Sequence, residues 1–355
     1  KTNRKTIFCR RMMRRLSLTL VASMARRGYC SRSVSMPPGL INHTPLLESR
    51  YLSQLCGTKV LLKMDALQPS GSFKDRGMAF MCAELQKRGV KSVVSSSGGN
   101  AGLAAATMGR KLGMQVRVIV PETTKPLMLE KMEREGASVE VFGENWNAAD
   151  EKARAYVQAD PHAAYVPPYE DPLLWEGHSS LIDELAAEFV DPAVRPGAIV
   201  ASVGGGGLMC GIIEGLKRHG WDDVELITTE TEGAACFARA KAAGEPVRLD
   251  AITSVATSLG ALECSPSALR LSAEHPTRAL MVTDQEAVGA CANFLDHHRV
   301  LVEPACGAAL ALAYSERHWP VLQRYDSVVF VVCGGGGVNE EILRGWKRDI
   351  LGPAA

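Results

Sequence analysis

A lysine stands near the start of an expected helix in the stretch PSGSFKDRGMAFM, residues 69–81. Amide hydrogens give a helix start about half a positive charge, so a lysine there is mildly disfavoured. The pattern predicts Ser72 as the N-cap, Asp75 as its capping-box partner and Gly89 as the stop. Lys74 then lies in the first turn. A solvated side chain is the ordinary explanation, so the rest of the chain must show whether this amine has a chemical use.

A run of four glycines follows a strand-like segment in VASVGGGGLMCG. The loop residues are Gly204, Gly205, Gly206 and Gly207, with Leu208 opening the next helix. Side-chain-free amides at a helix N-terminus suit a single phosphate. The run lacks the Lys-Ser/Thr of a Walker loop and the third glycine of a dinucleotide loop, and a tight turn remains the alternative. A second run of four glycines, 334–337, indicates only that another group approaches the backbone closely there.

A third loop, SSSGGNAG at 95–102, also joins a strand end to a helix start. Its hydroxyls, amides and carboxamide suit a carboxylate, although an ordinary capped turn would look the same. Ligands of doubly wound sheets bind beyond the carboxyl ends of strands, where all these features lie. An amine, a phosphate loop and a carboxylate loop together suggest a Schiff-base lysine that holds a phosphorylated aldehyde and acts on amino acids. The helix start would lower the pKa of Lys74 and favour the neutral amine.

Alternating strands and helices must position these residues. This rhythm predicts an α/β fold of two doubly wound domains with mainly parallel sheets. Residues 37–69 and 170–355 would form a large domain for the cofactor phosphate, and 70–169 a small domain with the lysine helix and the carboxylate loop. A proline-rich stretch near 165–175 reads as a hinge or linker. Strands are expected at 59–64, 92–95, 115–120, 138–142, 198–203, 224–230 and 327–333, and helices at 101–112 and 126–135 and from Leu208, Gly233 and Asn339.

Composition excludes several classes of protein. The 355 residues are 46% hydrophobic and 22% charged, which is typical of a soluble globular chain. Residues 37–355 carry 30 Lys and Arg against 39 Asp and Glu, which argues against a nucleic-acid partner. No apolar run reaches the roughly 18–20 residues of a membrane span. Ten scattered cysteines without a CxxC pair indicate buried thiols of a reducing compartment, and the histidines form no zinc motif.

Residues 1–36 form a basic leader with ten Lys and Arg and no acidic residue. This composition is typical of a mitochondrial transit peptide, while the apolar stretch 16–25 would also fit a secretory signal. A start at Met36 would remove the leader, and earlier starts at Met12, Met13 or Met24 are also open. The expected location is mitochondrial if the leader is translated and cytoplasmic otherwise.

Five stretches together resemble one enzyme family: LKMDALQPSGSFKDRG, PPYEDPLLWEGHSS, SVGGGGLMCG, ITSVATSLG and LVEPACGAALA. From about residue 40 to residue 350 the chain is similar to the L-serine dehydratases, or serine/threonine ammonia-lyases. These are fold-type II pyridoxal-phosphate enzymes of the tryptophan-synthase-β group. The resemblance implies a homodimer that converts L-serine, and L-threonine, to pyruvate or 2-oxobutanoate plus ammonia. It places the chain in amino-acid metabolism, including L-threonine catabolism and gluconeogenesis.

The resemblance also implies roles for single residues. Lys74 would form the Schiff base with pyridoxal phosphate and then act as the base at the substrate α-carbon, while Phe73 would flank the cofactor ring. Asn100 would bind the 3′ oxygen. Cys333 would face the ring nitrogen as a neutral thiol, which weakens the electron sink and favours prompt loss of the β-hydroxyl. Gly204, Gly205, Gly206, Gly207 and Leu208 would hold the phosphate, Ser97, Gly98, Gly99 and Asn100 the substrate carboxylate, and Gly204, Glu230, Ala234 and Leu259 a monovalent cation such as K⁺.

Gly98 departs from several mammalian relatives, which have alanine there, and the glycine could widen the substrate pocket or loosen its grip. Other functions stay open at this point. Serine racemisation or β-replacement could run on the same cofactor, and a pyridoxal-phosphate carrier without turnover could keep the fold. A phosphate-binding transferase without the cofactor is a further alternative.

Overall fold

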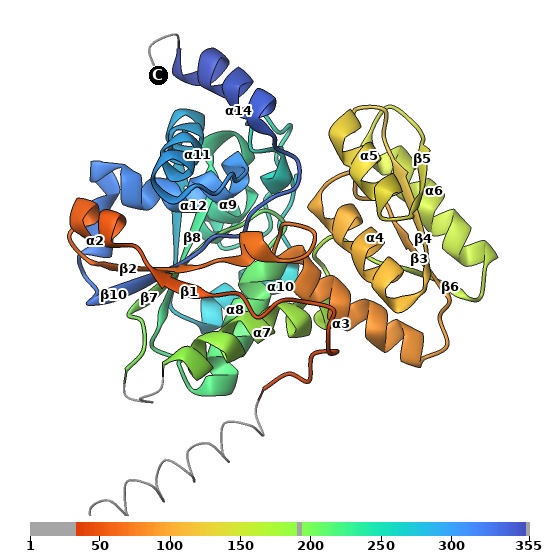
Figure 1. Ribbon diagram of the computed structural model, residues 1–355, viewed down its shortest axis with the longest axis horizontal. Helices are drawn as coiled ribbons and strands as arrows, with labels where there is room; N and C mark the ends of the chain where they lie inside the picture. The colour runs from red at the N-terminus through yellow and green to blue at the C-terminus, as the bar shows by residue number, and fades with distance from the viewer. Residues whose placement is uncertain (1–32, 190–193, 353–355) are drawn as a thin grey trace, which may run out of the picture. The chain divides into compact units, whose positions relative to one another are not determined.

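The computed structural model describes residues 33–189 and 194–352. Residues 36–355 form one compact unit built on two β-sheets (Figure 1). The predicted basic leader falls almost wholly outside the described residues. Within those residues, no helix has both the length and the apolar character that a membrane crossing requires.

The larger sheet has six strands and is parallel except at one edge, where β1 pairs antiparallel with β2. Its inner strands are mostly buried, as expected for parallel strands covered on both faces, and all but β8 are rich in apolar residues. Helices α11 and α12 lie on one side of this sheet, and α7 and α8 on the other (Figure 1). In sheet order the strands are β1 (Leu46–Glu48), β2 (Lys59–Lys63), β10 (Ser327–Val331), β7 (Ala198–Ser202), β8 (Glu225–Thr231) and β9 (Thr277–Val282).

The smaller sheet has four parallel strands. Helix α3 packs against both α4, which covers this sheet, and α7, which covers the larger one. The helix that begins with Lys74 therefore links the two sheets (Figure 1). In sheet order the strands are β5 (Ser138–Val141), β4 (Gln115–Val120), β3 (Ser92–Ser95) and β6 (Ala163–Tyr165).

The helices alternate with the strands along most of the chain. The α-helices are α2 (Arg50–Cys56), α3 (Lys74–Lys87), α4 (Asn100–Leu112), α5 (Pro126–Arg134), α6 (Trp146–Ala159), α7 (Pro172–Glu188), α8 (Gly207–His219), α9 (Cys236–Ala243), α10 (Pro266–Glu274), α11 (Asp284–His298), α12 (Pro304–Tyr314), α13 (Trp319–Leu322) and α14 (Glu340–Trp346). Short 3₁₀ segments are η1 (Asp65–Leu67), η2 (Glu232–Ala234), η3 (Thr257–Leu259) and η4 (Glu316–His318), and η5 (Lys347–Leu351) is a π-helical turn.

The predicted fold class, mixed α/β with mainly parallel sheets, is confirmed. The proline-rich stretch near 165–175 is only partly a connection, because α7 already begins at Pro172. The helix expected from Gly233 is also displaced. It begins at Cys236, after the short segment η2.

Candidate active site

Lys74 is the first residue of α3, and its amine donates a hydrogen bond to the Pro168 carbonyl over 2.5 Å. The same nitrogen lies 5.1 Å from the centre of the Phe73 ring. Desolvation of the amine lowers the pKa of Lys74 from 10.5 to about 8. The cause is desolvation rather than the helix start that the sequence suggested. A substantial neutral fraction near physiological pH makes this amine a usable nucleophile.

The turn before α3 is fixed differently from the predicted capping box. Phe73, not Ser72, occupies the N-cap position, and the Ser72 hydroxyl has no hydrogen-bond partner among the described residues. Asp75 instead accepts the N–H of Ser70 at 2.6 Å. The Phe73 N–H donates to the Cys333 carbonyl at 3.1 Å. The chain just after β10, rather than a serine cap, therefore holds the start of the lysine helix.

The loop Gly204–Gly207 joins β7 to α8 and requires glycine for two reasons. Gly206 has a φ of 101°, in the region that favours glycine. A Cβ on Gly205 would lie 2.3 Å from the Tyr169 ring, and one on Gly206 would lie 2.5 Å from the Ala268 side chain. The start of α8 thus offers backbone amides, and the glycine loop has no side chains that would cover them. This arrangement can bind an anion.

The segment of Pro168 and Tyr169 connects this loop to the lysine. Pro168 accepts the hydrogen bond from Lys74, and the ring of the next residue packs against Gly205. The Trp175 indole N–H donates to the Tyr169 carbonyl at 2.7 Å and so attaches the segment to α7. The expected phosphate loop and the expected Schiff-base lysine are therefore close neighbours in space.

The loop of residues 97–100 meets the second glycine run at Asn100. Asn100 begins α4, directly after Gly99 as the N-cap. The Gly336 N–H donates to Asn100 Oδ1 at 2.7 Å, and Asn100 Nδ2 donates to Glu303 Oε2 at 3.1 Å. The expected carboxylate loop therefore lies beside the loop that follows β10.

Glu303 is a residue of this site that the sequence analysis missed. Its carboxylate is 5% exposed and accepts hydrogen bonds from the Asn100 amide, the Ser258 hydroxyl and the Gly337 N–H. It directly precedes Pro304, the first residue of α12. The one sequence feature that could have pointed to Glu303 is an acidic residue before a proline at a helix start. That pattern usually marks only where a helix begins.

Cys333 follows β10 and is buried. A hydrogen bond with the Cys306 thiol and burial together raise the pKa of Cys333 well above its usual value. The thiol is therefore neutral over the physiological pH range. The backbone of the same residue holds the turn before α3, so Cys333 and Lys74 belong to one site.

Comparison with known proteins identifies the family. Residues 38–334 match the model of the family described as "Pyridoxal-phosphate dependent enzyme". The chain belongs to this family.

The relatives cover nearly the whole chain. Human L-serine dehydratase/L-threonine deaminase is 45% identical over 317 residues, which are 86% of this chain and 94% of that protein. L-serine dehydratase of Dictyostelium discoideum is 39% identical, covering 85% and 90%. Among solved structures, a fungal L-serine ammonia-lyase from Rhizomucor miehei matches with a TM-score of 0.81 and 35% identity, covering 87% of this chain and 99% of that one.

The residues around Lys74 fit the cofactor of this pyridoxal-phosphate family. An amine of lowered pKa suits its aldehyde. The amides at Gly204–Gly207 suit its phosphate, because the loop leads into the N-terminus of α8, where backbone N–H groups have no partners within the helix. The neutral thiol of Cys333 and the ring of Phe73 suit an aromatic nitrogen heterocycle.

Of the residues expected to hold a cation, Leu259 lies directly against Gly204 of the glycine loop. A Cβ on Gly204 would lie 3.1 Å from the Leu259 Cα. Glu230 is 1% exposed and accepts two backbone N–H groups from the start of α9, and Ala234 ends the intervening segment η2. Burial raises the pKa of Glu230 to about 8. Among the described residues no basic side chain is paired with Glu230, and both of its carboxyl oxygens accept backbone N–H groups.

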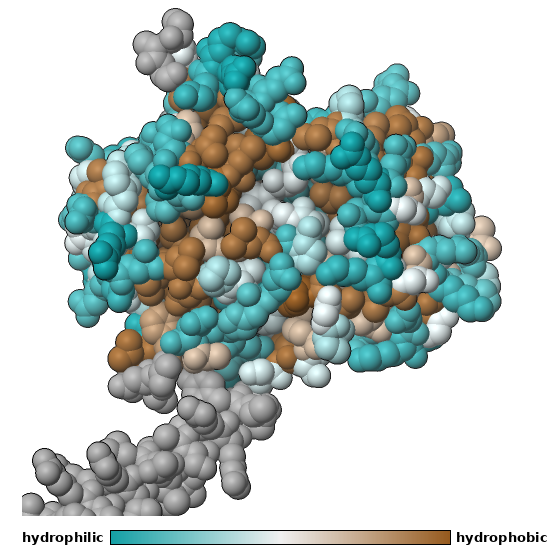
Figure 2. Space-filling view, viewed as in Figure 1, coloured by the Kyte–Doolittle hydropathy of each residue, from teal (hydrophilic) through white to brown (hydrophobic). Residues whose placement is uncertain are grey.

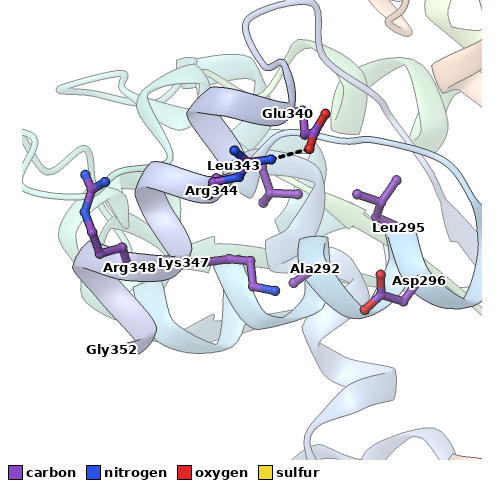
Figure 3. Close-up of a pocket in the computed structure, with 9 residues that line it drawn as sticks. All are labelled: Ala292, Leu295, Asp296, Glu340, Leu343, Arg344, Lys347, Arg348 and Gly352. Carbon is purple, nitrogen blue, oxygen red and sulfur yellow. Dashed lines mark hydrogen bonds and ion pairs between the residues drawn. The ribbon is translucent and has the colours of Figure 1, made fainter. Parts of the chain in front are cut away.

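A large cavity of about 390 Å³ lies elsewhere, between α11, α14 and η5 (Figure 3). Its lining includes the apolar Leu295 and Leu343, and the Lys347 side chain extends from η5 toward Ala292 of α11 (Figure 3). A hydrophobic area on the surface lies directly below α14 and over α11 (Figure 2). None of the residues expected to do chemistry lines this cavity.

Proposed function

We propose that the protein is a pyridoxal-phosphate-dependent ammonia-lyase that converts L-serine to pyruvate and ammonia, and L-threonine to 2-oxobutanoate and ammonia. The observation that supports the proposal is a set of contacts between the expected site segments. Lys74 donates to Pro168, and the next residue packs against Gly205 of the glycine loop. Asn100 of the loop at 97–100 accepts the N–H of Gly336, in the loop that follows Cys333. The 45% identity to human L-serine dehydratase/L-threonine deaminase supports the choice of substrates.

Lys74 is proposed to bind the cofactor aldehyde and later to hold the proton taken from the substrate α-carbon. Its lowered pKa supports both tasks, since the amine can lose and regain a proton near neutral pH. The amides of Gly204–Gly207 and Leu208 would hold the phosphate, and Phe73 would lie against the ring. The bound cofactor supplies the electron sink that stabilises negative charge at the α-carbon.

Cys333 is proposed to set the reaction outcome. A neutral thiol does not protonate the ring nitrogen, so negative charge at the α-carbon is only weakly stabilised and early loss of the β-hydroxyl is favoured. Ser97, Gly98, Gly99 and Asn100 would bind the substrate carboxylate, and the Asn100 amide would also reach the cofactor's 3′ oxygen. Glu303 supports this arrangement because it accepts a hydrogen bond from that amide.

The proposal is tested with the full chain loaded with pyridoxal phosphate. Incubation with L-serine and L-threonine should release 2-oxoacid and ammonia in equal amounts, measured by coupled assays. Lys74→Ala should abolish both products and the visible absorption of the covalently held cofactor, while Lys152→Ala, distant from the site, should keep them. Accumulation of D-serine without pyruvate, or a loaded protein that releases no ammonia, would contradict the proposal.

We further propose the division into a large domain, 37–69 with 170–355, and a small domain, 70–169; each predicted domain contains one of the two sheets.

The family resemblance is the basis for two more proposals: a homodimer, and K⁺ bound near Gly204, Glu230, Ala234 and Leu259. No nucleic acid or membrane is expected to bind. The basic leader supports a mitochondrial location where it is translated, and a cytoplasmic one otherwise. Light scattering, K⁺ titration of activity and imaging of tagged chains with and without residues 1–35 test these points.

A further inference from the structure

His178 lies on α7, against Phe73, the residue that precedes Lys74. Its side chain is fully buried, and its ring lies 5.0 Å from the Phe73 ring at an angle of 55°. Neither ring nitrogen has a hydrogen-bond partner within residues 33–189 and 194–352. Nearly all buried polar groups in proteins are paired, so this imidazole needs an explanation.

Two helices, α3 and α8, pack against His178 of α7, and each does so at a glycine. A Cβ on Gly77 of α3 would lie 2.6 Å from His178 Cε1, and one on Gly211 of α8 would lie 2.5 Å from its Cβ. A Cβ on Gly177 of α7 would lie 2.4 Å from the Arg76 carbonyl, so α3 and α7 touch through their backbones. The imidazole therefore has little room to turn, and it presents a fixed surface to Phe73.

An apolar side chain would be the more stable choice at this junction. Two buried nitrogens without partners carry a desolvation penalty that an apolar side chain of similar size would avoid. Protonation would not help, because burial and the positive charges of Lys74 and Arg76 hold the pKa of His178 well below its usual value. The neutral imidazole of His178 nevertheless lies against Phe73. The ring of Phe73 in turn lies 5.1 Å from the Lys74 nitrogen.

We propose that His178 is a positioning residue of the Lys74 site: it supports the Phe73 ring from below and so fixes the wall against which the cofactor ring lies. The inference rests on the proposed function, because it requires the cofactor to bind at Lys74. It needs no contact between His178 and the cofactor. Removing the imidazole leaves Phe73 free to tilt toward α7, away from the lysine.

The test is a double-mutant cycle on the full-length apoprotein with His178→Leu, Phe73→Leu and the double variant. Cofactor affinity is measured by titration with pyridoxal phosphate, without substrate. His178→Leu should weaken binding about three- to tenfold, the range of a ring–ring contact, and should shift the absorption maximum of the bound cofactor. The double variant should bind no more weakly than Phe73→Leu alone, because His178 acts through that ring.

Stability separates this positioning role from a merely structural one. His178→Leu should leave the unfolding temperature of the apoprotein unchanged or raise it, because two unpaired nitrogens are removed. His178→Gln serves if the leucine variant does not fold, and should weaken cofactor binding similarly. His275 is the control: it is buried and donates to the Val224 carbonyl at 2.9 Å, so His275→Leu should lower the unfolding temperature without changing cofactor affinity.

Additive losses in the cycle, or unchanged cofactor affinity in both His178 variants, would overturn the inference. A wild-type protein that binds the cofactor but releases no pyruvate from L-serine would instead overturn the proposed function, and the binding cycle would still decide the role of His178. A wild-type protein that binds no cofactor would overturn both.

Discussion

The properties of Lys74 follow from where its amine lies rather than from the helix that carries it. Desolvation lowers the pKa of the amine to about 8, and the Pro168 carbonyl accepts its hydrogen bond. The folded chain therefore releases this proton about two pH units earlier than an unfolded lysine, whose pKa is about 10.4. Below pH 8 the folded state must hold a poorly solvated cation, which is unfavourable.

The lowered pKa of Lys74 predicts that replacing this lysine with an uncharged residue raises the free energy of unfolding, by an amount that depends on pH. Between about pH 8 and pH 10.4 the unfolded chain binds more protons at this position, so the contribution of Lys74 to the free energy of unfolding rises with pH. Lys74→Met should therefore stabilise the apoprotein at pH 7 and have much less effect near pH 10.5. Urea unfolding at both values measures this, and an equal effect at the two would contradict the stated pKa.

Gly98 is crowded from one side by Thr124. A Cβ on Gly98 would lie 2.6 Å from the Thr124 hydroxyl oxygen and 2.8 Å from its methyl carbon. Gly98→Ala should therefore displace the loop proposed to bind the substrate carboxylate, and raise KM for L-serine about tenfold. Thr124→Ala in the same chain should restore KM, because it removes both atoms. No rescue in the double variant would show that Thr124 is not the obstacle.

At the scale of elements, α3 is anchored by buried charges in its first turn, which also carries the lysine. The Arg76 guanidinium donates to both carboxylate oxygens of Asp65 at 2.8 Å, and to Glu184 at 2.7 and 2.8 Å. Lys63 donates to Glu184 at 2.6 Å. Two basic and two acidic groups thus balance, and the helix is bound to η1, β2 and α7 at once.

Removing one member of this network should be costly. Arg76→Leu leaves two buried carboxylates without their main partner and should lower the free energy of unfolding by about 3–5 kcal/mol. Arg134→Leu is the matched control, because its pair with Glu130 is exposed and should contribute less than about 1 kcal/mol. Equal losses in denaturant unfolding of the two variants would contradict a special role for the buried network.

The elements that sequence reasoning located are those with a strong local signal. β7 and β3 are short apolar runs next to glycine loops, and both lie where expected. By contrast α12 was missed, because its stretch PACGAALALAY is apolar on all sides and shows no helical stripe. Ser72 is of a residue type that often caps helices, but it does not cap α3. The turn before α3 is instead held by a hydrogen bond to Cys333, which is distant in sequence.

At the scale of the whole molecule, the glycine loops and Lys74 could be placed at one site because strand ends of parallel sheets converge. Glu303, Tyr169 and His178 could not, since their importance depends on contacts between segments far apart in the chain. A single sequence carries no record of such contacts. Their residue types also look ordinary where they occur.

Several contacts join the four-stranded part of the molecule to its C-terminal part near this site. Lys125 Nζ lies 5.2 Å from the centre of the Trp346 ring, and Lys131 Nζ donates to the Gly336 carbonyl at 2.5 Å. A cavity of about 10 Å³ lies between Lys125, Trp346 and Glu303. A cavity of this size has room for about one water molecule, so an amino acid passing this way must separate these contacts.

Loss of the Lys125–Trp346 contact should therefore favour the open arrangement. Lys125→Met keeps the length of the side chain but removes the charge, and should raise KM for L-serine about two- to tenfold with kcat unchanged, the range expected for a cation–π contact. Lys152→Met is the control, away from the site: Lys152 Nζ lies 3.9 Å from the Phe142 ring and also pairs with Glu140, so this variant loses an ion pair in addition to its cation–π contact. Because both variants lose one cation–π contact, a shared defect would reflect general stability, whereas a KM effect confined to Lys125→Met would show that this contact closes the site over its substrate.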